Sequence, residues 1–175
     1  MDYLKERCKA VVYSIPEKDW NDLISLMISK KKIFVYGSGR SGLIGQLFSV
    51  RMVQLGLDVH FVGDMTTPII GKDDLTILVS NTGQTLSVVK TAEIAKRIGS
   101  HVVSITSSAS SKLAAASDTT IVLKIKKDEM DSKLAPLGTI FEDTVLFFFD
   151  CIIPELMIRL NVTEEDMRRR HAIWV

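Results

Sequence analysis

The sequence lacks an excess of charge of either sign. Its 22 Lys and Arg residues nearly balance 21 Asp and Glu residues, which gives a formal net charge of +1 at pH 7. Binding to nucleic acid or to an acidic membrane depends on a basic surface that attracts phosphate groups. The short basic run Arg168–Arg170 does not create one. We therefore expect no nucleic-acid partner and no membrane partner.

Cysteine is scarce as well, because Cys8 and Cys151 are the only two. They form no C-x-x-C pair and no zinc-ligand spacing, so the sequence predicts two reduced, buried thiols and no metal site. The first residues, Met1–Arg7, also lack the apolar core of a secretory signal peptide. We expect a cytoplasmic protein.

Long hydrophobic runs are missing too. The strongly apolar stretch Val145–Ile153 contains Asp150 and is followed by Pro154. It is far shorter than the roughly 18 residues that a membrane-spanning helix needs. A helix that is apolar on nearly every side is instead buried in a core or between subunits. This stretch therefore favours a homo-oligomer.

What the sequence does contain is typical of a globular domain, with 46% apolar and 25% charged residues in a chain of 175. We find no linker, low-complexity tract or convincing repeat, so we expect a single domain over residues 1–175. Apolar residues at three- and four-residue spacing predict N-terminal helices within residues 1–31. Pro16 suits the first turn of the second of these helices.

From Lys32 onward, short β-branched runs alternate with helical stretches. This alternation predicts an α/β fold with a doubly wound, five-stranded parallel sheet between two layers of helices. The predicted strands are Ile33–Tyr36, Val59–Val62, Leu75–Val79, Val102–Ile105 and Thr119–Ile125, and the helices between them are Ser41–Leu55, Thr85–Ile98 and Ser111–Ala116.

The C-terminal part, residues 139–171, is predicted to be helical. One helix should span Thr139–Leu160, and Thr163 should cap a second helix. That second helix has acidic residues in its first turn and Arg168–Arg170 in its last, as the helix dipole favours. The dipole is a sufficient structural reason for the arginines.

Two loops at strand ends carry the strongest functional signal. Ser80–Thr85 follows the strand Leu75–Val79, and three of its side chains carry hydroxyl groups. Hydroxyls, free backbone amides and a helix N-terminus form a socket for phosphate. The earlier loop Gly37–Gly42 has the same placement after a strand. Together the loops predict a small phosphorylated metabolite held from two sides.

The first loop also matches the dinucleotide fingerprint, Gly37-x-Gly39-x-x-Gly42, with Asp64 placed where a ribose-binding acid is expected. Against a nicotinamide cofactor, the chain has no length for a separate substrate domain, and the fingerprint has no use for the loop Ser80–Thr85. We expect no cofactor.

Four blocks together resemble the sugar isomerase (SIS) domain family, and more narrowly its 6-phospho-3-hexuloisomerases. In chain order they are Gly37-Ser-Gly-Arg-Ser-Gly42, Thr66-Thr67-Pro68, Ser80-Asn-Thr-Gly-Gln-Thr85 and Ala135-Pro-Leu-Gly-Thr-Ile-Phe-Glu142. The two glycine loops carry the broad resemblance, and the last block together with Arg170-His171 carries the narrower one.

The resemblance implies a cofactor-independent isomerisation of 3-hexulose 6-phosphate to fructose 6-phosphate through a 2,3-enediolate, as in the ribulose monophosphate pathway. It also implies a homotetramer in which the terminal helices contact neighbouring subunits. Two departures stand out. Gln84 replaces the family's acidic residue, and Ala172–Val175 replace the family's usual tail after His171.

Glu142 and His171 are the catalytic residues that the resemblance implies. From spacing alone, Thr139-Ile-Phe-Glu142 is a capping box, in which the glutamate only caps its helix. The family match favours a base instead. His171 would move protons at the substrate oxygens or open the sugar ring, either in its own subunit or in a neighbouring one. His101 begins a predicted strand and His60 lies within one, so both are poorer candidates.

The remaining loop residues are predicted to bind substrate. The alternative role for Arg40 is a structural ion pair with Asp64, and the alternative role for the two threonines before Pro68 is to shape their turn. The predicted binding residues are Gly39, Arg40, Ser41, Thr66, Thr67, Ser80, Asn81, Thr82, Gly83 and Thr85. Two other functions stay open: an aldose–ketose isomerase of the same fold, and a non-catalytic module that senses a sugar phosphate.

Overall fold

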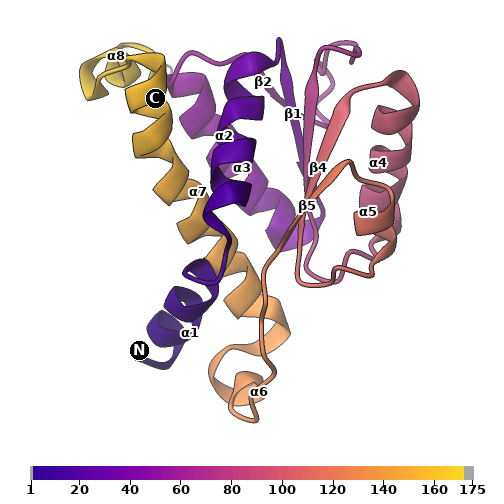
Figure 1. Ribbon diagram of the computed structural model, residues 1–175, viewed down its shortest axis with the longest axis vertical. Helices are drawn as coiled ribbons and strands as arrows, with labels where there is room; N and C mark the ends of the chain where they lie inside the picture. Colours follow the sequence, from indigo (N-terminus) through magenta and orange to yellow (C-terminus); the bar gives the residue numbers. More distant parts are fainter. Residues whose placement is uncertain (1, 172–175) are drawn as a thin grey trace.

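The protein is described from a computed structural model, which places residues 2–171 (Figure 1). Five parallel strands form one sheet in the order β2-β1-β3-β4-β5. The strands are β1 (Ile33–Gly37), β2 (Val59–Phe61), β3 (Leu75–Val79), β4 (His101–Thr106) and β5 (Thr119–Val122). The helices are α1 (Asp2–Val12), α2 (Glu17–Ser29), α3 (Gly39–Gln54), α4 (Leu86–Ile98), α5 (Lys112–Ala115), α6 (Asp131–Leu134), α7 (Thr139–Leu160) and α8 (Glu164–Arg169), with a 3₁₀ turn η1 at Pro136–Gly138.

Helices cover both faces of the sheet, which confirms the predicted doubly wound α/β fold. Side chains of α2, α3 and α7 share one core with the face of the sheet that carries Val35 and Ile77. Side chains of α4 and α5 pack on the other face, against Leu78 and Val102. Figure 1 shows α4 and α5 on one side of the strands and the remaining long helices on the other.

The strand order places a topological switch at the centre of the sheet. The chain passes from β1 outward to β2 and then returns to β3, on the other side of β1. β1 and β3 pair residue for residue, from Ile33 with Leu75 to Gly37 with Val79, so the two strands end at the same level. In sheets of this order the crevice beyond the carboxyl ends of these two strands is the usual ligand site.

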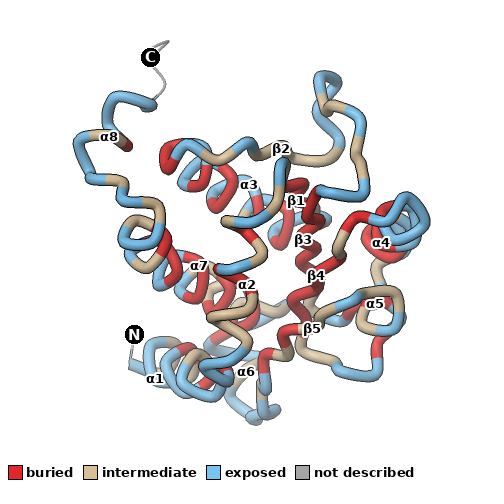
Figure 2. Tube along the Cα trace, turned by 45° about the horizontal axis from the view of Figure 1, so that its top comes forward, coloured by how far each residue is buried: buried red, intermediate tan, exposed pale blue. Residues whose placement is uncertain are grey.

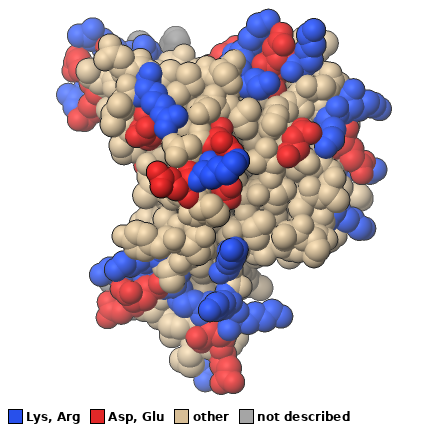
Figure 3. Space-filling view, in the orientation of Figure 1, with Lys and Arg blue, Asp and Glu red and all other residues tan. Residues whose placement is uncertain are grey.

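The apolar segment Val145–Ile153 lies inside α7, whose Val145, Phe148 and Phe149 are buried in the main core. The ring of Phe149 stacks on that of Phe48 from α3, with centroids 3.8 Å apart. No helix within residues 2–171 is long and apolar enough to cross a membrane. In Figure 3, acidic and basic side chains are interspersed over the visible face, as the balanced composition leads one to expect.

Several details differ from the sequence predictions. Pro16 is the N-cap of α2, one position before the helix, and not part of its first turn. β5 ends at Val122 and not at Ile125. The short helix α6 was not predicted. Cys8 is buried as expected, but Cys151 is exposed on α7, so the prediction of two buried thiols is wrong for Cys151.

Candidate active site

The two predicted loops lie side by side, because each follows one of the paired central strands. Gly37 ends β1, and Ser80 follows β3 directly. The first loop leads at once into α3, which begins at Gly39 with Ser38 as its N-cap. The second loop leads into α4, with Thr85 as its N-cap. The topology therefore brings two helix N-termini to the crevice at the switch point.

An ion pair between Arg40 and Glu142 connects the first loop to α7. The Arg40 Nε donates a hydrogen bond to Glu142 Oε2. Glu142 is buried, with 8% of its surface exposed, whereas the Arg40 side chain is largely exposed. This hydrogen bond, and then the charge of the carboxylate, raises the pKa of Arg40 above its usual value. Glu142 is thus a buried carboxylate whose partner is an exposed cation of the first loop.

This pairing corrects two interpretations of the sequence. The ion pair of Arg40 is formed with Glu142 and not with Asp64, within the residues that the structure describes. Glu142 is also not a capping-box residue, because the N-cap of α7 is Gly138 and Thr139 is already helical. The Thr139 hydroxyl donates instead to the Pro136 carbonyl, at 2.6 Å. The carboxylate is thereby left to Arg40.

The second loop presents its hydroxyls close to the start of α4. The Ser80 and Thr85 hydroxyl oxygens lie 3.3 Å apart, and Ser80 is buried. The Thr82 hydroxyl is exposed and accepts a hydrogen bond from the Gln84 backbone N–H, at 3.3 Å. The first turn of α4 contains no acidic residue. This arrangement suits an anion, since helix N-termini and hydroxyl donors both favour negative charge.

Asn81 is fixed by the end of β4. Its main-chain oxygen accepts hydrogen bonds from the Ser107 N–H and the Thr106 hydroxyl, both at 2.9 Å. The Ser107 hydroxyl lies 2.8 Å from both the main-chain oxygen and the side-chain Oδ1 of Asn81. Sequence analysis missed Ser107, although it follows a predicted strand at the same edge of the sheet as the two loops. Ser107 could have been identified by the same criterion as the two loops, which is a polar side chain just after a predicted strand.

Gly83 adopts the left-handed conformation, with φ of 61°, and is packed against Ser111. A Cβ at position 83 would clash with the Ser111 hydroxyl. The Gly83 carbonyl accepts a hydrogen bond from the Leu113 N–H, at 3.0 Å. The second loop is therefore held in place by contacts with α5 as well as with the end of β4.

A cavity of about 340 Å³ lies between the end of β4 and the segment before α7. Asn81 and Ser107 line one side, and Lys127, Asp131 and Leu137 line the other. Leu137 is 98% exposed and has a φ of 57°, which a leucine rarely adopts. Sequence analysis assigned none of these three residues to the site. Lys127 and Asp131 lie outside the strand-end loops, and Leu137 appeared only within the fourth block of the family resemblance.

Thr66 and Thr67 lie in the loop after β2. The Thr67 hydroxyl lies 2.6 Å from the carbonyl oxygen of Asp64, in the same loop, and 3.2 Å from that of Phe61, the last residue of β2. Thr66 is exposed. The contacts of Thr67 are those of a turn-shaping residue, which is the second of the two roles considered for it.

His171 is not brought to the crevice of its own chain. It lines a small hollow with Arg51 and Gln54, at the C-terminal end of α3, whereas Arg40 lies at the N-terminal end of that helix. His101 begins β4, at the opposite edge of the sheet from the loops, and its Nε2 lies 3.0 Å from the Thr119 hydroxyl. Within residues 2–171 no cluster of three or more His, Cys, Asp or Glu side chains is arranged to hold a metal ion.

Comparison with known proteins places these features in a family context. The SIS domain profile matches residues 26–147. A 3-hexulose-6-phosphate isomerase from Methanocaldococcus jannaschii is 44% identical over 152 residues, which cover 87% of this chain and 82% of that protein. A 3-hexulose-6-phosphate isomerase from Bacillus subtilis is 31% identical over 98% of this chain and 94% of its own length.

The fold agrees with this similarity. A crystal structure of a Methanococcus jannaschii protein, for which the function of 3-hexulose-6-phosphate isomerase was inferred, matches with a TM-score of 0.89. The two chains are 37% identical, and the match covers 99% of this chain and 98% of the other.

Proposed function

This chain belongs to the SIS domain family, and from that premise we propose that it is a sugar-phosphate isomerase that interconverts 3-hexulose 6-phosphate and fructose 6-phosphate. The relatives that are 44% and 31% identical to it are 3-hexulose-6-phosphate isomerases. The observation that carries the proposal is the buried carboxylate of Glu142, held by Arg40 at the switch point of the sheet.

The second loop is proposed to hold the phosphate of the substrate. Ser80, Thr82 and Thr85 supply hydroxyl groups, and the start of α4 supplies backbone N–H groups and the positive end of its dipole. The contacts of Asn81 and Gly83 with β4 and α5 keep the loop in place before the substrate arrives. Little ordering is then needed on binding, which favours affinity.

Glu142 is proposed to be the base. Starting from fructose 6-phosphate, its carboxylate removes the proton on C3, and the electron pair of that C–H bond forms the C2–C3 double bond of a 2,3-enediolate. The C2 oxygen takes up the negative charge and is protonated. Returning the first proton to C2, while the C3 hydroxyl gives up its own proton and becomes a carbonyl, completes the isomerisation. The hydrogen moves within one substrate, so the reaction balances without an oxidant or reductant.

Arg40 is proposed to change partners during the reaction. In the free protein its guanidinium binds Glu142, and its side chain is largely exposed. A substrate oxygen that takes over this hydrogen bond would release the carboxylate to accept a proton. The guanidinium would then stabilise the negative charge that develops on the enediolate oxygen, as positioned cations do in other sites. Ser41 and Gly39, in the same loop, border the sugar in this arrangement.

His171 is proposed to serve the site of a neighbouring subunit. Its place at the far end of α3 separates it from Glu142 of the same chain. A neutral imidazole carries one nitrogen that donates a proton and one that accepts, so it can move protons between the two substrate oxygens. This role depends on an assembly of several chains.

The proposal can be tested by NMR in heavy water with fructose 6-phosphate and the protein alone. Deuterium entering C3, or the appearance of a 3-hexulose phosphate, is the expected result because both require the 2,3-enediolate. Deuterium at C1 would identify an aldose–ketose isomerase instead. Saturable binding of fructose 6-phosphate and of the 3-hexulose phosphate, with neither exchange nor conversion of either sugar, would overturn the assignment as an enzyme.

A further inference from the structure

The second loop offers a phosphate group hydrogen bonds but no opposite charge. None of the residues Ser80–Thr85 is charged, and the first turn of α4 is neutral as well. In the first loop, the cation Arg40 is paired with Glu142. A phosphate ester carries nearly two negative charges at neutral pH, and proteins commonly place lysine or arginine beside such a group. Within residues 80–89 a bound phosphate would have no cation as its partner.

Lys127 is a cation on the wall of the cavity that adjoins the second loop. This cavity of about 340 Å³ has Asn81 and Ser107 on one side and Lys127 on the other. The Lys127 side chain is exposed, and within residues 2–171 it forms neither an ion pair nor a hydrogen bond. Its ammonium group can therefore bind an anion without losing an existing partner.

The acidic side chain on the same wall, Asp131, is already paired. The Tyr3 hydroxyl donates a hydrogen bond to its Oδ1 at 2.6 Å. The Arg7 guanidinium lies 3.2 Å from the same oxygen and 3.4 Å from Oδ2. An anion in the cavity is therefore repelled less by Asp131 than it would be by an unpaired carboxylate.

Arg7 of α1 holds the chain on both sides of Lys127. Its Nη2 donates a hydrogen bond to the Lys126 carbonyl, and its Nη1 lies 3.3 Å from Asp128 Oδ2. The Arg7 side chain is only 18% exposed. Figure 2 shows α1 beside the largely exposed segment that carries α6. Because its two neighbours are anchored, Lys127 needs little backbone ordering when it binds a ligand.

Asn81 presents a second donor to the same cavity. Its Oδ1 accepts a hydrogen bond from the Ser107 hydroxyl at 2.8 Å. An amide whose oxygen is occupied in this way still has two N–H groups to donate. Within the described part of the chain, no acceptor receives them. Asn81 and Lys127 thus offer donors from opposite walls of one cavity.

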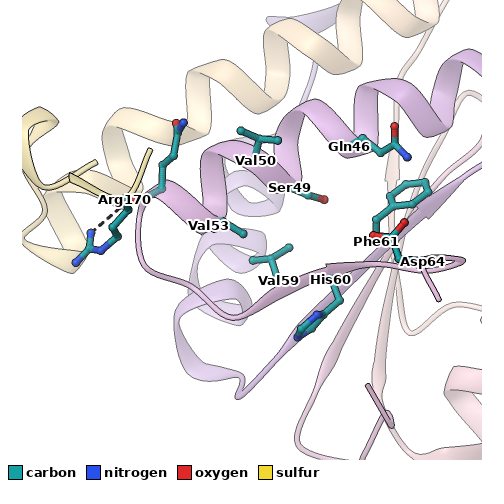
Figure 4. A pocket seen from close by; sticks show the side chains of 10 residues that line it. Gln46, Ser49, Val50, Val53, Val59, His60, Phe61, Asp64 and Arg170 are labelled. Carbon is teal, nitrogen blue, oxygen red and sulfur yellow. Dashed lines mark hydrogen bonds between the residues drawn. The ribbon is translucent and has the colours of Figure 1, made fainter. Parts of the chain in front are cut away.

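The larger groove between α3 and β2 is a poorer match for an anion (Figure 4). Its volume is about 410 Å³, and its lining includes Val53, Val59 and the acidic Asp64. The cation in its lining, Arg170, already donates a hydrogen bond to the Gln54 carbonyl at 3.2 Å. None of the lining residues belongs to the second loop. The smaller cavity is therefore the better place for a charged group held by that loop.

We propose that Lys127 is a further substrate-binding residue, whose ammonium group contacts the 6-phosphate from the wall opposite Asn81. This inference rests on the proposed function, because it concerns the phosphate of that substrate. The hydroxyl groups of a sugar are neutral, so the phosphate is the group with which an ammonium forms a charge-assisted hydrogen bond. Arg7 is a positioning residue in this arrangement, since it acts on the substrate only through Lys127.

Lys127→Met tests the contact by binding, without reference to turnover. Calorimetry with fructose 6-phosphate should show a Kd raised about 10-fold, the lower end for a charged hydrogen bond, because Lys127 is exposed. Lys126→Met is the matched control: it removes the same charge from the neighbouring exposed residue, which does not line the cavity. Its Kd should stay close to that of the wild type. An unchanged Kd for Lys127→Met, or equal losses in both variants, would overturn the contact.

Inorganic phosphate identifies the group that Lys127 contacts. The Lys127→Met protein should bind inorganic phosphate more weakly than the wild type, by a factor similar to that for fructose 6-phosphate. Raising the ionic strength from about 0.02 M to about 0.5 M should reduce the difference between the two proteins, because salt screens the charge of an exposed lysine. Weaker binding of the sugar phosphate with unchanged binding of inorganic phosphate would overturn the assignment to the phosphate.

Arg7→Lys tests the positioning role. This variant keeps the charge beside Asp131 but loses the planar fork that reaches the Lys126 carbonyl and Asp128 together. The Kd for fructose 6-phosphate should rise about threefold, with kcat nearly unchanged, as expected for a weakened substrate contact. In the Lys127→Met background, Arg7→Lys should cause no further loss, because the two residues act through one contact. Additive losses would overturn the positioning role.

These measurements separate the role of Lys127 from the proposed reaction. A wild-type protein that binds fructose 6-phosphate without converting it would refute the isomerase, and the binding comparison would still decide the role of Lys127. A wild-type protein that does not bind fructose 6-phosphate would refute the proposed substrate, and the titration with inorganic phosphate would then decide it.

Discussion

The two strand-end loops occupy equivalent places in the sheet but are built differently. The first loop, residues 37–42, sends a charged side chain across the crevice to α7, where Arg40 meets Glu142. The second loop, residues 80–85, keeps its side chains neutral and is fixed by hydrogen bonds and packing from β4 and α5. The first loop thus carries one charged, exposed side chain, and the second carries neutral hydroxyl groups on a backbone that β4 and α5 hold in place.

In the proposed reaction, this difference suits a division of roles between the two loops. A phosphate group keeps its charge throughout an isomerisation, so it is best held by groups that do not move. The reacting carbons gain and lose charge, so the groups beside them must change partners. We therefore expect changes at the Arg40–Glu142 pair to affect turnover, and changes in the second loop to affect substrate affinity.

The largest effect is expected for Glu142→Gln. Removing a positioned base should lower kcat by about 10²–10⁴-fold while KM changes little. The measurement is the rate of isomerisation, with circular dichroism to verify the fold. Glu155→Gln is the control, because Glu155 lies on the same helix and binds Arg159 at 2.7 Å, away from the crevice. Wild-type turnover in a folded Glu142→Gln protein would rule out the base.

Thr82→Ala changes the second loop and should weaken substrate binding. Losing one hydrogen bond to a charged phosphate costs about 1.5–3 kcal/mol, which corresponds to a rise in KM of roughly 10–150-fold with kcat nearly unchanged. Steady-state kinetics separates the two constants. Thr91→Ala, whose hydroxyl donates to the Ser87 carbonyl within α4, should leave both unchanged. A fall in kcat at constant KM would contradict the assignment of the second loop to substrate affinity.

Gly39→Ala and Gly83→Ala compare the rigidity of the two loops directly. Both glycines are left-handed, with φ of 57° and 61°. Each substitution should therefore cost about 1–2 kcal/mol of backbone strain. A Cβ at Gly39 has no atom within 4 Å in the described part of the chain, whereas one at Gly83 meets Ser111. Gly83→Ala should lose a further ~1–3 kcal/mol through overpacking. Urea unfolding measures both, and equal losses would show that the second loop is no more tightly packed than the first.

The smallest effect is expected for Ser107→Ala. This change removes the hydroxyl beside Asn81 but leaves the hydrogen bonds of the Ser107 N–H and the Thr106 hydroxyl in place. The free energy of unfolding should fall by about 0.5–1.5 kcal/mol. Ser110→Ala, an exposed serine of the same segment, is the control for urea unfolding. An unchanged stability would mean that backbone contacts alone hold the second loop.

Much of the fold follows from local patterns in the sequence. The bounds of β3 agree with prediction, because its β-branched apolar run ends abruptly at a polar loop. The bounds of α7 also agree with the predicted ones. Thr163 is the N-cap of α8, as predicted, and forms a capping box with Asp166. Strand order and strand ends then placed both loops in one crevice. These features depend on nearby residues, which a sequence displays directly.

The contacts within the site were less predictable. The pattern Thr139-x-x-Glu142 satisfies the capping-box rule, but Pro136–Gly138 forms a 3₁₀ turn and moves the N-cap to Gly138. The partner of Arg40 is on α7, and no local pattern connects the two residues. Side-chain pairing between distant segments depends on how the helices pack on one another and on the sheet. The spacing of residues along the sequence carries no information about that packing.

The Arg40–Glu142 pair joins residues that are 102 positions apart. It can form only after the parallel strands have been assembled and α7 has docked on α3, and parallel pairing of this kind is slow because long loops must close first. Under the proposed assignment, a chain that emerges from synthesis would form its phosphate-binding loop before its base is in place. Activity would then mark the completion of folding, and a truncated or half-folded chain could hold a sugar phosphate without converting it.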